Sequence, residues 1–271
     1  MLNFLGINII FDIIYCMKSK QTLFIILFFF FAFSGFSQSV KVLEKTDKTN
    51  LPIGKDFSYI EAGLDTSKLQ FTGTFEATGF RENSWISELF NVIKTNAQSA
   101  GANSFVLISF SEDFKKNIST LVLKTYMMND STLKLNNSKH EKNTIYVFSS
   151  EKLDTTSFEG FYLNSIFIKL KTGKYFRKET NLKEAIKLSN GYGGSGTYDY
   201  KRDNEIPNMY ITLARFGNGG SGVSGFYGSS NSIGIRFGAE GRGLYFLDTN
   251  IGILMSKILK QSAGIIRPPK P

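Results

Sequence analysis

The sequence predicts an α+β protein, in which a helix-on-sheet β-α-β-β-β unit is followed by a mostly β unit closed by a C-terminal helix. Three patterns indicate this class. Apolar and polar residues alternate over 69–77, an apolar stripe of helical period follows over 86–100, and short apolar runs bounded by glycines recur in the second half. The composition, 42% hydrophobic and 20% charged over 271 residues, excludes a disordered chain.

The first strand and the helix after it have the most regular patterns. The alternation over 69–77 is typical of a half-buried strand, which Gly79 ends. Asn83 and Ser84 then offer an N-cap for a helix. The apolar stripe of this helix consists of Ile86, Leu89, Phe90, Ile93, Ala97 and Ala100. Gly101 stands where the end of a helix favours a residue with positive φ.

The remainder of the first unit, which we place at 57–150, is predicted to be strands. The continuous apolar run at 105–108 predicts a buried strand, and the stretches 118–127 and 144–148 predict two more. A polar loop over 129–143 is expected to separate these last two strands.

The second unit, at 160–262, combines strands with glycine-rich loops. The stretches 166–170 and 175–177 predict a hairpin that turns at Gly173. Further elements are a helical turn at 182–186, strands at 209–216 and 232–237, and a helix at 249–260 that Asp248 caps. A polar arm at 38–56, a connector at 151–159 and a tail at 263–271 complete the mature chain. The two units form either one compact body or two abutting halves.

The N-terminus carries a predicted export signal at 17–37. Lys18 and Lys20 form a short basic region, and the apolar run at 23–33 is too short to cross a bilayer. Ser37 ends a small-residue cleavage site, so we expect cleavage after it and no transmembrane segment in the mature chain. The alternative is an uncleaved anchor. Residues 1–16 are interpreted as sequence upstream of a misassigned start.

The phenylalanine-rich core that ends in Phe36-Ser37-Gln38 resembles the secretion signals of Bacteroidetes, the flavobacteria especially. This resemblance implies export to the periplasm, the outer envelope or the medium. The chain is expected to end in a helix and a proline-rich tail. Such an end differs from the β-sandwich sorting domain of type IX export, so release to the periplasm or outer envelope is expected.

A second resemblance covers residues 84–110. The string from Ala97 to Ile108 runs from an alanine-bearing helix through Gly-Ala-Asn into a buried strand. It is similar to small β-α-β domains of envelope and stress-related proteins. The resemblance implies a structural or signalling module and transfers no functional residue.

The composition excludes several chemistries. With one cysteine and one histidine, the chain lacks a disulfide framework and a Cys/His zinc site. His140, in a lysine-rich loop, is expected to be exposed and without a role. Two G-x-G-x-x-G strings, at 191–196 and 217–222, lack the strand-to-helix context of a dinucleotide site. We therefore expect no cofactor, no metal and no enzymatic activity.

Two sets of residues are candidates for binding. Four tyrosines in or beside glycine-rich loops offer stacking faces for sugars, with a core role as the alternative: Tyr192, Tyr198, Tyr200 and Tyr227. Four basic residues are candidates to face an anion, with a solvated sheet face as the alternative: Lys169, Lys171, Lys174 and Arg177. With a net charge of +9, the partner expected is an anionic glycan or an envelope surface, and not nucleic acid, with solubility alone as the alternative explanation of the charge. The oligomeric state stays open.

The leading functional hypothesis is therefore an exported, non-enzymatic envelope protein with a structural or binding role. A glycan-binding accessory module that uses the tyrosine-bearing loops is the alternative. A glycosidase comes third, because paired carboxylates would suffice for its chemistry. Its acidic candidates are Glu112, Asp113, Asp199, Asp203 and Glu205.

Overall fold

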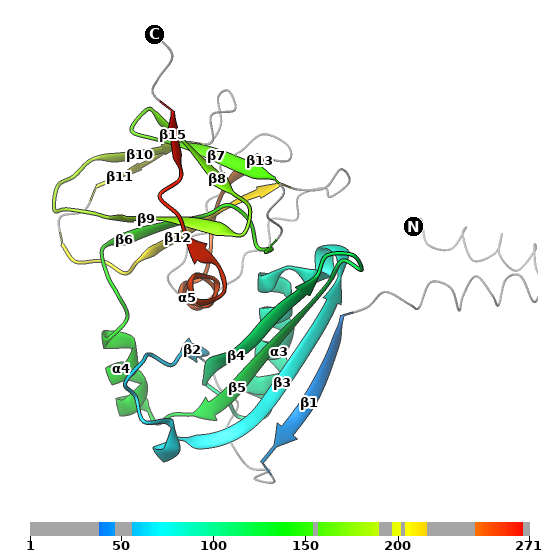
Figure 1. Cartoon of the computed structure of the whole chain (residues 1–271). Coiled ribbons are helices and arrows are strands. Elements are labelled where there is room, and N and C mark those ends of the chain that lie inside the picture. Colours follow the sequence, from blue (N-terminus) through cyan, green and yellow to red (C-terminus); the bar gives the residue numbers. More distant parts are fainter. Residues whose placement is uncertain are drawn as a thin grey trace, which may run out of the picture. The chain divides into compact units, whose positions relative to one another are not determined.

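The computed structural model describes residues 38–46, 56–153, 157–189, 197–201, 204–215 and 242–267. Residues from Gln38 onward form one compact unit. Its described part contains three α-helices and three five-stranded sheets (Figure 1). The predicted α+β class is thereby confirmed. The predicted signal segment at 17–37 and the predicted strand at 232–237 lie outside the described residues.

Sheet 1 carries the helix-on-sheet part of the fold. Its strand order is β1 (Ser39–Lys45), β3 (Gln70–Phe80), β5 (Ile118–Met127), β4 (Ser104–Asp113) and β2 (Ser58–Tyr59). The predicted polar arm thus contains an edge strand, β1, which pairs antiparallel with β3. The arm lacks a strong strand pattern because most residues of β1 are exposed.

Helix α3 (Ile86–Ser99) packs against β3 and β5 of sheet 1 (Figure 1). The predicted stripe is buried from Ile86 to Ala97, and Gly101 has the expected positive φ of 87°. The start of the helix differs from the prediction. Arg81–Ser84 forms a 3-10 turn, and Trp85 is the N-cap residue without a side-chain cap.

The predicted polar loop at 129–143 instead contains helix α4 (Asp130–Ser138). The side chain of Asn129 caps it by accepting a hydrogen bond from the amide of Thr132 at 2.8 Å. Only Leu133 and Asn136 of this helix are buried. Because so few of its residues are apolar, the helix lacks the periodic stripe on which sequence prediction depends.

Sheets 2 and 3 form the rest of the fold. Sheet 2 has the order β13 (Arg242–Phe246), β12 (Met209–Arg215), β6 (Thr144–Phe148), β9 (Lys174–Glu179) and β14 (Lys260–Gln261). Sheet 3 has the order β11 (Thr197–Tyr200), β10 (Ile186–Ser189), β7 (Phe158–Leu163), β8 (Ile166–Lys171) and β15 (Ile265–Arg267). A core cluster contributed by both sheets includes Ile145, Val147, Phe161, Ile168 and Ile211.

Four predictions about these sheets need correction. Strand β6 belongs to sheet 2 and not to the first unit's sheet. The predicted hairpin at 166–177 is a corner, since β8 and β9 belong to different sheets and Gly173 turns between them with φ 77°. The predicted helical turn at 182–186 is a tight turn in which Lys183 has a positive φ of 61°, and Ile186 already begins strand β10. The predicted tail contains β15, which pairs with β8.

Helix α5 (Thr249–Ile258) joins the two parts of the fold. Asp248 caps it as predicted, accepting a hydrogen bond from the amide of Asn250 at 2.9 Å. The helix contacts α3, β2 and β4 on one side and β12 of sheet 2 on the other. One hydrophobic core therefore runs from Phe105 of sheet 1 through Leu254 to Tyr210 of sheet 2. Within the described ranges, every helix is too short or too polar to cross a membrane.

Candidate functional site

The larger of the two cavities described has a volume of about 470 Å³. It lies where the end of α4, the start of β6, the segment 205–208 and the N-terminus of α5 meet. Most of its lining residues are polar, the exceptions being Ile206 and Pro207. The lining comprises Ser58, Asn137, His140, Glu141, Lys142, Glu205, Ile206, Pro207, Asn208, Thr249 and Asn250.

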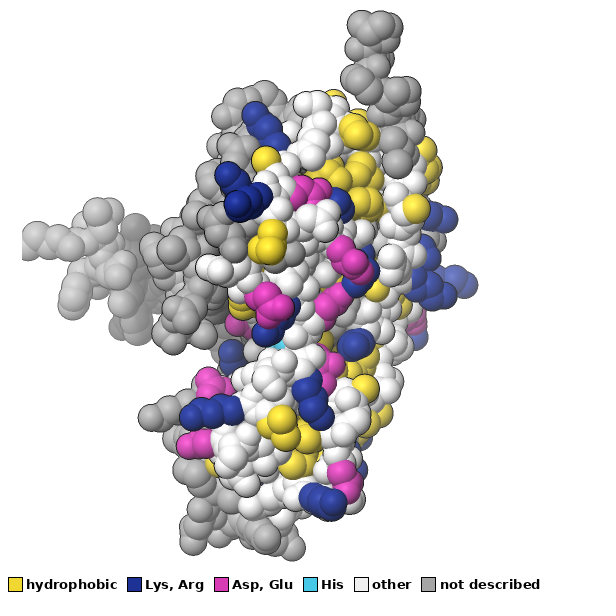
Figure 2. All heavy atoms as spheres, turned by 90° about the vertical axis from the view of Figure 1, so that its left-hand side faces the viewer, with side chains coloured by type: hydrophobic (Ala, Val, Ile, Leu, Met, Phe, Trp, Pro, Cys, Tyr) yellow, Lys and Arg dark blue, Asp and Glu magenta, His cyan; other side chains and the backbone are white. Residues whose placement is uncertain are grey.

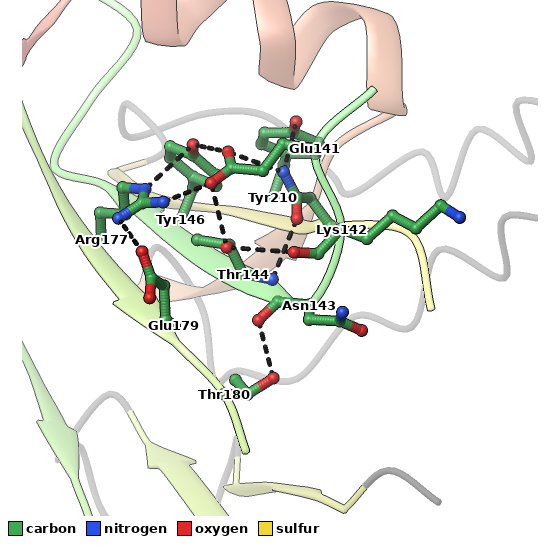
Figure 3. A network of polar contacts seen from close by, with 10 residues as sticks. Glu141, Lys142, Asn143, Thr144, Tyr146, Arg177, Glu179, Thr180 and Tyr210 are labelled. Carbon is green, nitrogen blue, oxygen red and sulfur yellow. Dashed lines mark hydrogen bonds and ion pairs between the residues drawn. The ribbon is translucent and has the colours of Figure 1, made fainter. Parts of the chain in front are cut away.

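Glu141 is the centre of a hydrogen-bond network on one wall of this cavity (Figure 3). Its carboxylate accepts hydrogen bonds from the Tyr146 hydroxyl, from Nη2 of Arg177 and from Nδ2 of Asn208, the last at 3.2 Å. A further hydrogen bond comes from the Thr144 hydroxyl at 3.3 Å. The carboxylate thus has four donors, and its position is fixed before any ligand arrives.

The geometry of sheet 2 brings these residues together from distant parts of the sequence. Tyr146 of β6 lies opposite Arg177 of β9 and opposite Tyr210 of β12. Directly paired residues share one face of a sheet, so the three side chains form a row. The rings of Tyr146 and Tyr210 stack with centroids 5.1 Å apart. Asn208 is held in turn by the amide of Thr144, from which it accepts a hydrogen bond at 2.9 Å.

The network changes the acidity of its members. Burial acts to raise the pKa of Glu141, but the hydrogen bonds from Tyr146, Arg177 and Asn208 outweigh it and hold that pKa below its ordinary value. Burial and the neighbouring carboxylate raise the pKa of Tyr146, and burial raises the pKa of Tyr210 to about 12. The hydrogen bond to Glu141 raises the pKa of Arg177. At neutral pH the wall therefore carries a carboxylate, a guanidinium and neutral phenols.

The charged side chains around the cavity are paired with one another. Arg177 also forms an ion pair with Glu179 at 2.8 Å, and Lys142 pairs with Glu205 at 3.2 Å. Figure 2 shows acidic and basic side chains interleaved across the middle of one face of the molecule. Charges that are already paired in this way favour a neutral polar ligand over a strongly charged one.

His140 also lines the cavity, and the expectation that it is exposed is wrong. Its side chain is only 14% exposed, because the imidazole packs beside strand β2. Nε2 lies 3.3 Å from the carbonyl oxygen of Tyr59 and 3.8 Å from the Glu61 carboxylate. A carbonyl oxygen only accepts, so the contact with Tyr59 is a hydrogen bond when Nε2 carries the proton.

The described residues contain no group of three or more histidine, cysteine, aspartate or glutamate side chains that could hold a metal ion. The acidic candidates for glycosidase chemistry are dispersed. Glu112 accepts a hydrogen bond from the amide of Leu153, and Asp113 pairs with Lys116 at 3.5 Å. Glu205 lines the cavity, the side chain of Asp199 is not described, and Asp203 lies outside the described residues.

The basic candidates are divided between two sheets. Lys169 and Lys171 lie on β8, Lys174 begins β9, and Arg177 belongs to the network. Of the tyrosines, Tyr198 and Tyr200 lie on β11, opposite Leu188 and Ile186. Their side chains are not among those described, and Tyr192 and Tyr227 lie outside the described residues.

Lys169 and Lys171 belong to an aromatic surface, which we call the outer face of sheet 3. Ile168 and Leu170 of β8 are buried, so the alternating lysines point away from the core. Phe158 is 38% exposed and lies opposite Lys171, and Nζ of Lys169 lies 4.2 Å from the centre of its ring. On the same face, the rings of Tyr162 and Phe167 lie 5.1 Å apart, and Ile265 is 53% exposed.

Sequence reasoning missed Glu141, Asn208 and the two stacked tyrosines. Glu141 lies in a segment expected to be a polar loop, and three of its four partners are at least five positions away along the chain. One signal was available: Tyr146 and Tyr210 occur in apolar strands, where a buried hydroxyl requires a hydrogen-bond partner. The chain matches no protein-family model, no curated protein and no solved structure.

Proposed function

We propose that this is an exported, non-enzymatic envelope protein that binds a neutral, hydroxyl-rich ligand, such as part of a glycan, in the cavity beside Glu141. The observation that carries the proposal is the lining of that cavity. It combines three asparagine side chains with a fixed carboxylate and two hydroxyls: Asn137, Asn208, Asn250, Glu141, Ser58 and Thr249. A side-chain amide offers a donor and an acceptor side by side, which suits the neighbouring hydroxyl groups that a sugar presents.

The state of Glu141 favours binding over catalysis. A general acid needs a raised pKa, whereas the pKa of Glu141 is lowered by its hydrogen bonds from Tyr146, Arg177 and Asn208. A general base needs an accessible lone pair, and four donors already occupy this carboxylate. The volume, about 470 Å³, lies within the range of small-molecule sites, roughly 300–1,000 Å³.

Introducing a tryptophan into the wall of this cavity tests the proposal. Asn137 and Ser138 are adjacent, exposed residues of α4, but only Asn137 lines the cavity. We expect Asn137→Trp to abolish binding of neutral mono- and disaccharides, measured by calorimetry, and Ser138→Trp to leave it unchanged. If the unaltered protein binds none of these sugars, or if Asn137→Trp binds them normally, the proposal is wrong.

Export is the second part of the proposal. It is supported by the basic region at Lys18 and Lys20, the short apolar run and the small residues before Gln38. We expect protein recovered from the envelope fraction to begin at Gln38, as measured by intact mass and N-terminal sequencing. A recovered chain that retains residues 17–37 would establish the uncleaved anchor instead.

A second candidate function, binding of an acidic polysaccharide, is favoured by the outer face of sheet 3. Exposed Phe158 and the two lysines beside it, Lys169 and Lys171, combine a ring that can stack on a sugar with charges that attract an anion. We expect retention on acidic polysaccharide to survive about 0.5 M salt, where the Debye length is about 4 Å. Retention that is already lost at about 0.2 M salt would reflect net charge alone.

Two double variants distinguish binding at the outer face of sheet 3 from attraction by the net charge alone. The double variant Lys169→Gln, Lys171→Gln is expected to lose salt-resistant retention. Lys134→Gln, Lys139→Gln removes the same charge from exposed positions on and beside α4 and is expected to keep it. Equal losses in the two double variants would exclude a shaped site on sheet 3.

A further inference from the structure

A second cavity, of about 210 Å³, lies beside the N-terminus of α3 and shares no lining residue with the cavity at Glu141. It is lined by Trp85, Ser149, Ser150, Glu151, Lys152, Ser157, Glu159, Thr172, Thr212 and Leu213. Five of these ten residues carry hydroxyl groups and two carry carboxylates. Nothing in the proposed function uses this cavity.

The serine hydroxyls nearest the end of β6 are already satisfied. Ser149 Oγ donates to the carbonyl oxygen of Lys174 at 2.8 Å and accepts from its amide at 3.3 Å. Ser150 Oγ makes the equivalent pair of hydrogen bonds with the backbone of Lys152, at 3.2 and 3.1 Å. These two residues therefore shape the cavity but contribute little further hydrogen-bonding capacity.

Thr212 is different. It is only 2% exposed, and its Oγ1 has no hydrogen-bond partner within the described part of the chain. An unpartnered buried hydroxyl costs about 1–3 kcal/mol, so such a group beside a cavity indicates a missing partner. Ser157 and Thr172 share one hydrogen bond at 2.6 Å, which leaves further acceptor capacity on the same lining.

The charges around the cavity are predominantly negative. Glu151 and Glu159 line it, while Lys152 supplies the only positive charge among the described residues of the lining. The Glu151 carboxylate accepts a hydrogen bond from the amide of Ser87 at 2.9 Å, in the first turn of α3. Burial raises the pKa of Glu151, and the nearby carboxylate of Glu88 also raises that pKa. The hydrogen bonds from Ser87 act in the opposite direction. An additional positive charge here would offset both the cost of burying the Glu151 carboxylate and its repulsion by Glu88.

We propose that this cavity binds a small primary amine, whose ammonium group donates hydrogen bonds to Thr212 Oγ1 and to the carboxylate of Glu151. An ammonium group has three donors and no acceptor, which suits a lining in which acceptors outnumber donors. Trp85 supplies an aromatic face of the kind that attracts cations. The volume equals about seven water molecules at roughly 30 Å³ each, so the ligand is small.

Trp85 makes the test direct, because it is the only tryptophan in the chain. All tryptophan fluorescence of the purified protein therefore reports on the wall of this cavity. We expect titration with ethanolamine to change that fluorescence in a saturable way. Ethylene glycol, which is similar in size but has no charge, is expected to produce no saturable change.

Two buried hydroxyls provide a matched pair of variants. Thr212 Oγ1 and Ser119 Oγ are both buried and unpartnered among the described residues, but only Thr212 lines the cavity. Thr212→Val is expected to weaken ethanolamine binding about tenfold, and Ser119→Ala to leave it unchanged. Glu151→Gln, which removes the charge but keeps an acceptor for Ser87, is expected to weaken it by at least about tenfold.

Four outcomes would overturn the proposal. An equal response to ethylene glycol would make the cavity a polyol site, and a response to Ca²⁺ or Mg²⁺ alone would make it a metal site. No saturable response to any of these probes would mean that the cavity holds only water. If Thr212→Val and Ser119→Ala weakened ethanolamine binding equally, the cause would be a less stable fold and not the loss of a contact in the cavity.

Discussion

Replacing Gly252 with alanine is expected to destabilise the protein by about 3 kcal/mol, the upper end of the usual cost of overpacking. A β-carbon at this position would lie 2.0 Å from Cγ and 2.4 Å from Cδ1 of Tyr210, far inside van der Waals contact. Gly252 lies at the end of the first turn of α5, and alanine is normally favoured over glycine in a helix by about 1 kcal/mol. The expected effect therefore has the opposite sign to helix propensity.

Tyr210 has little freedom to move away from such a β-carbon. It is 5% exposed, its ring stacks on that of Tyr146, and its hydroxyl accepts a hydrogen bond from Asn208 at 3.3 Å. The clash would therefore push α5 away from sheet 2. Because Thr249 and Asn250 of α5 line the cavity, Gly252→Ala is also expected to weaken sugar binding.

Urea unfolding, followed by circular dichroism, measures the stability change. Lys257→Arg, on an exposed position of the same helix, keeps the positive charge that lies 5.6 Å from the centre of the Tyr59 ring. It is the control and is expected to change stability by less than about 0.5 kcal/mol. If Gly252→Ala is as stable as the unaltered protein, α5 does not lie against Tyr210 as described. The link between the helix and the cavity would then be lost as well.

The parts of the fold that could be predicted from the sequence are those determined by neighbouring residues. The strand β3, the stripe of α3 and the positive φ of Gly101 all follow from patterns within about 30 consecutive positions. The cap at Asp248 is a local signal of the same kind. In each case the residues that indicate the element are also those that stabilise it.

The candidate site could not be predicted, because it depends on pairings between distant strands. Strand β6 has the composition of any buried strand, and its own sequence does not determine that it pairs with β9 and β12. Glu141 meets Arg177 and Asn208 only because of that pairing. Similarly, the sequence at Thr172 and Gly173 is typical of a hairpin turn, and only the sheet topology shows that β8 and β9 belong to separate sheets.

Replacing Glu141 with glutamine is expected to cost about 2 kcal/mol at neutral pH, although the two side chains have nearly the same size. The carboxylate of Glu141 accepts from Tyr146, Arg177 and Asn208, whereas one end of a glutamine is itself a donor. At least one donor would lose its partner, and the ion pair with Arg177 would be lost as well. Because the Glu141 side chain is 41% exposed, water compensates for part of this loss.

The effect should depend on pH in a defined direction. The folded state lowers the pKa of Glu141, so the carboxylate contributes stability above its unfolded pKa of about 4.3. That contribution is lost as the pH falls through the lower, folded pKa. The stability difference between the unaltered protein and Glu141→Gln is therefore expected to shrink when urea unfolding is repeated at about pH 3.

Glu179→Gln is the matched control for this prediction, because Glu179 also pairs with Arg177, at 2.8 Å, but is 73% exposed. An exposed pair of this kind contributes at most about 1 kcal/mol, so this variant should be nearly neutral. Equal effects of Glu141→Gln and Glu179→Gln would mean that Arg177 needs only a nearby negative charge. The wall of the cavity would then not be fixed in advance, and the argument for a prearranged binding site would fail with it.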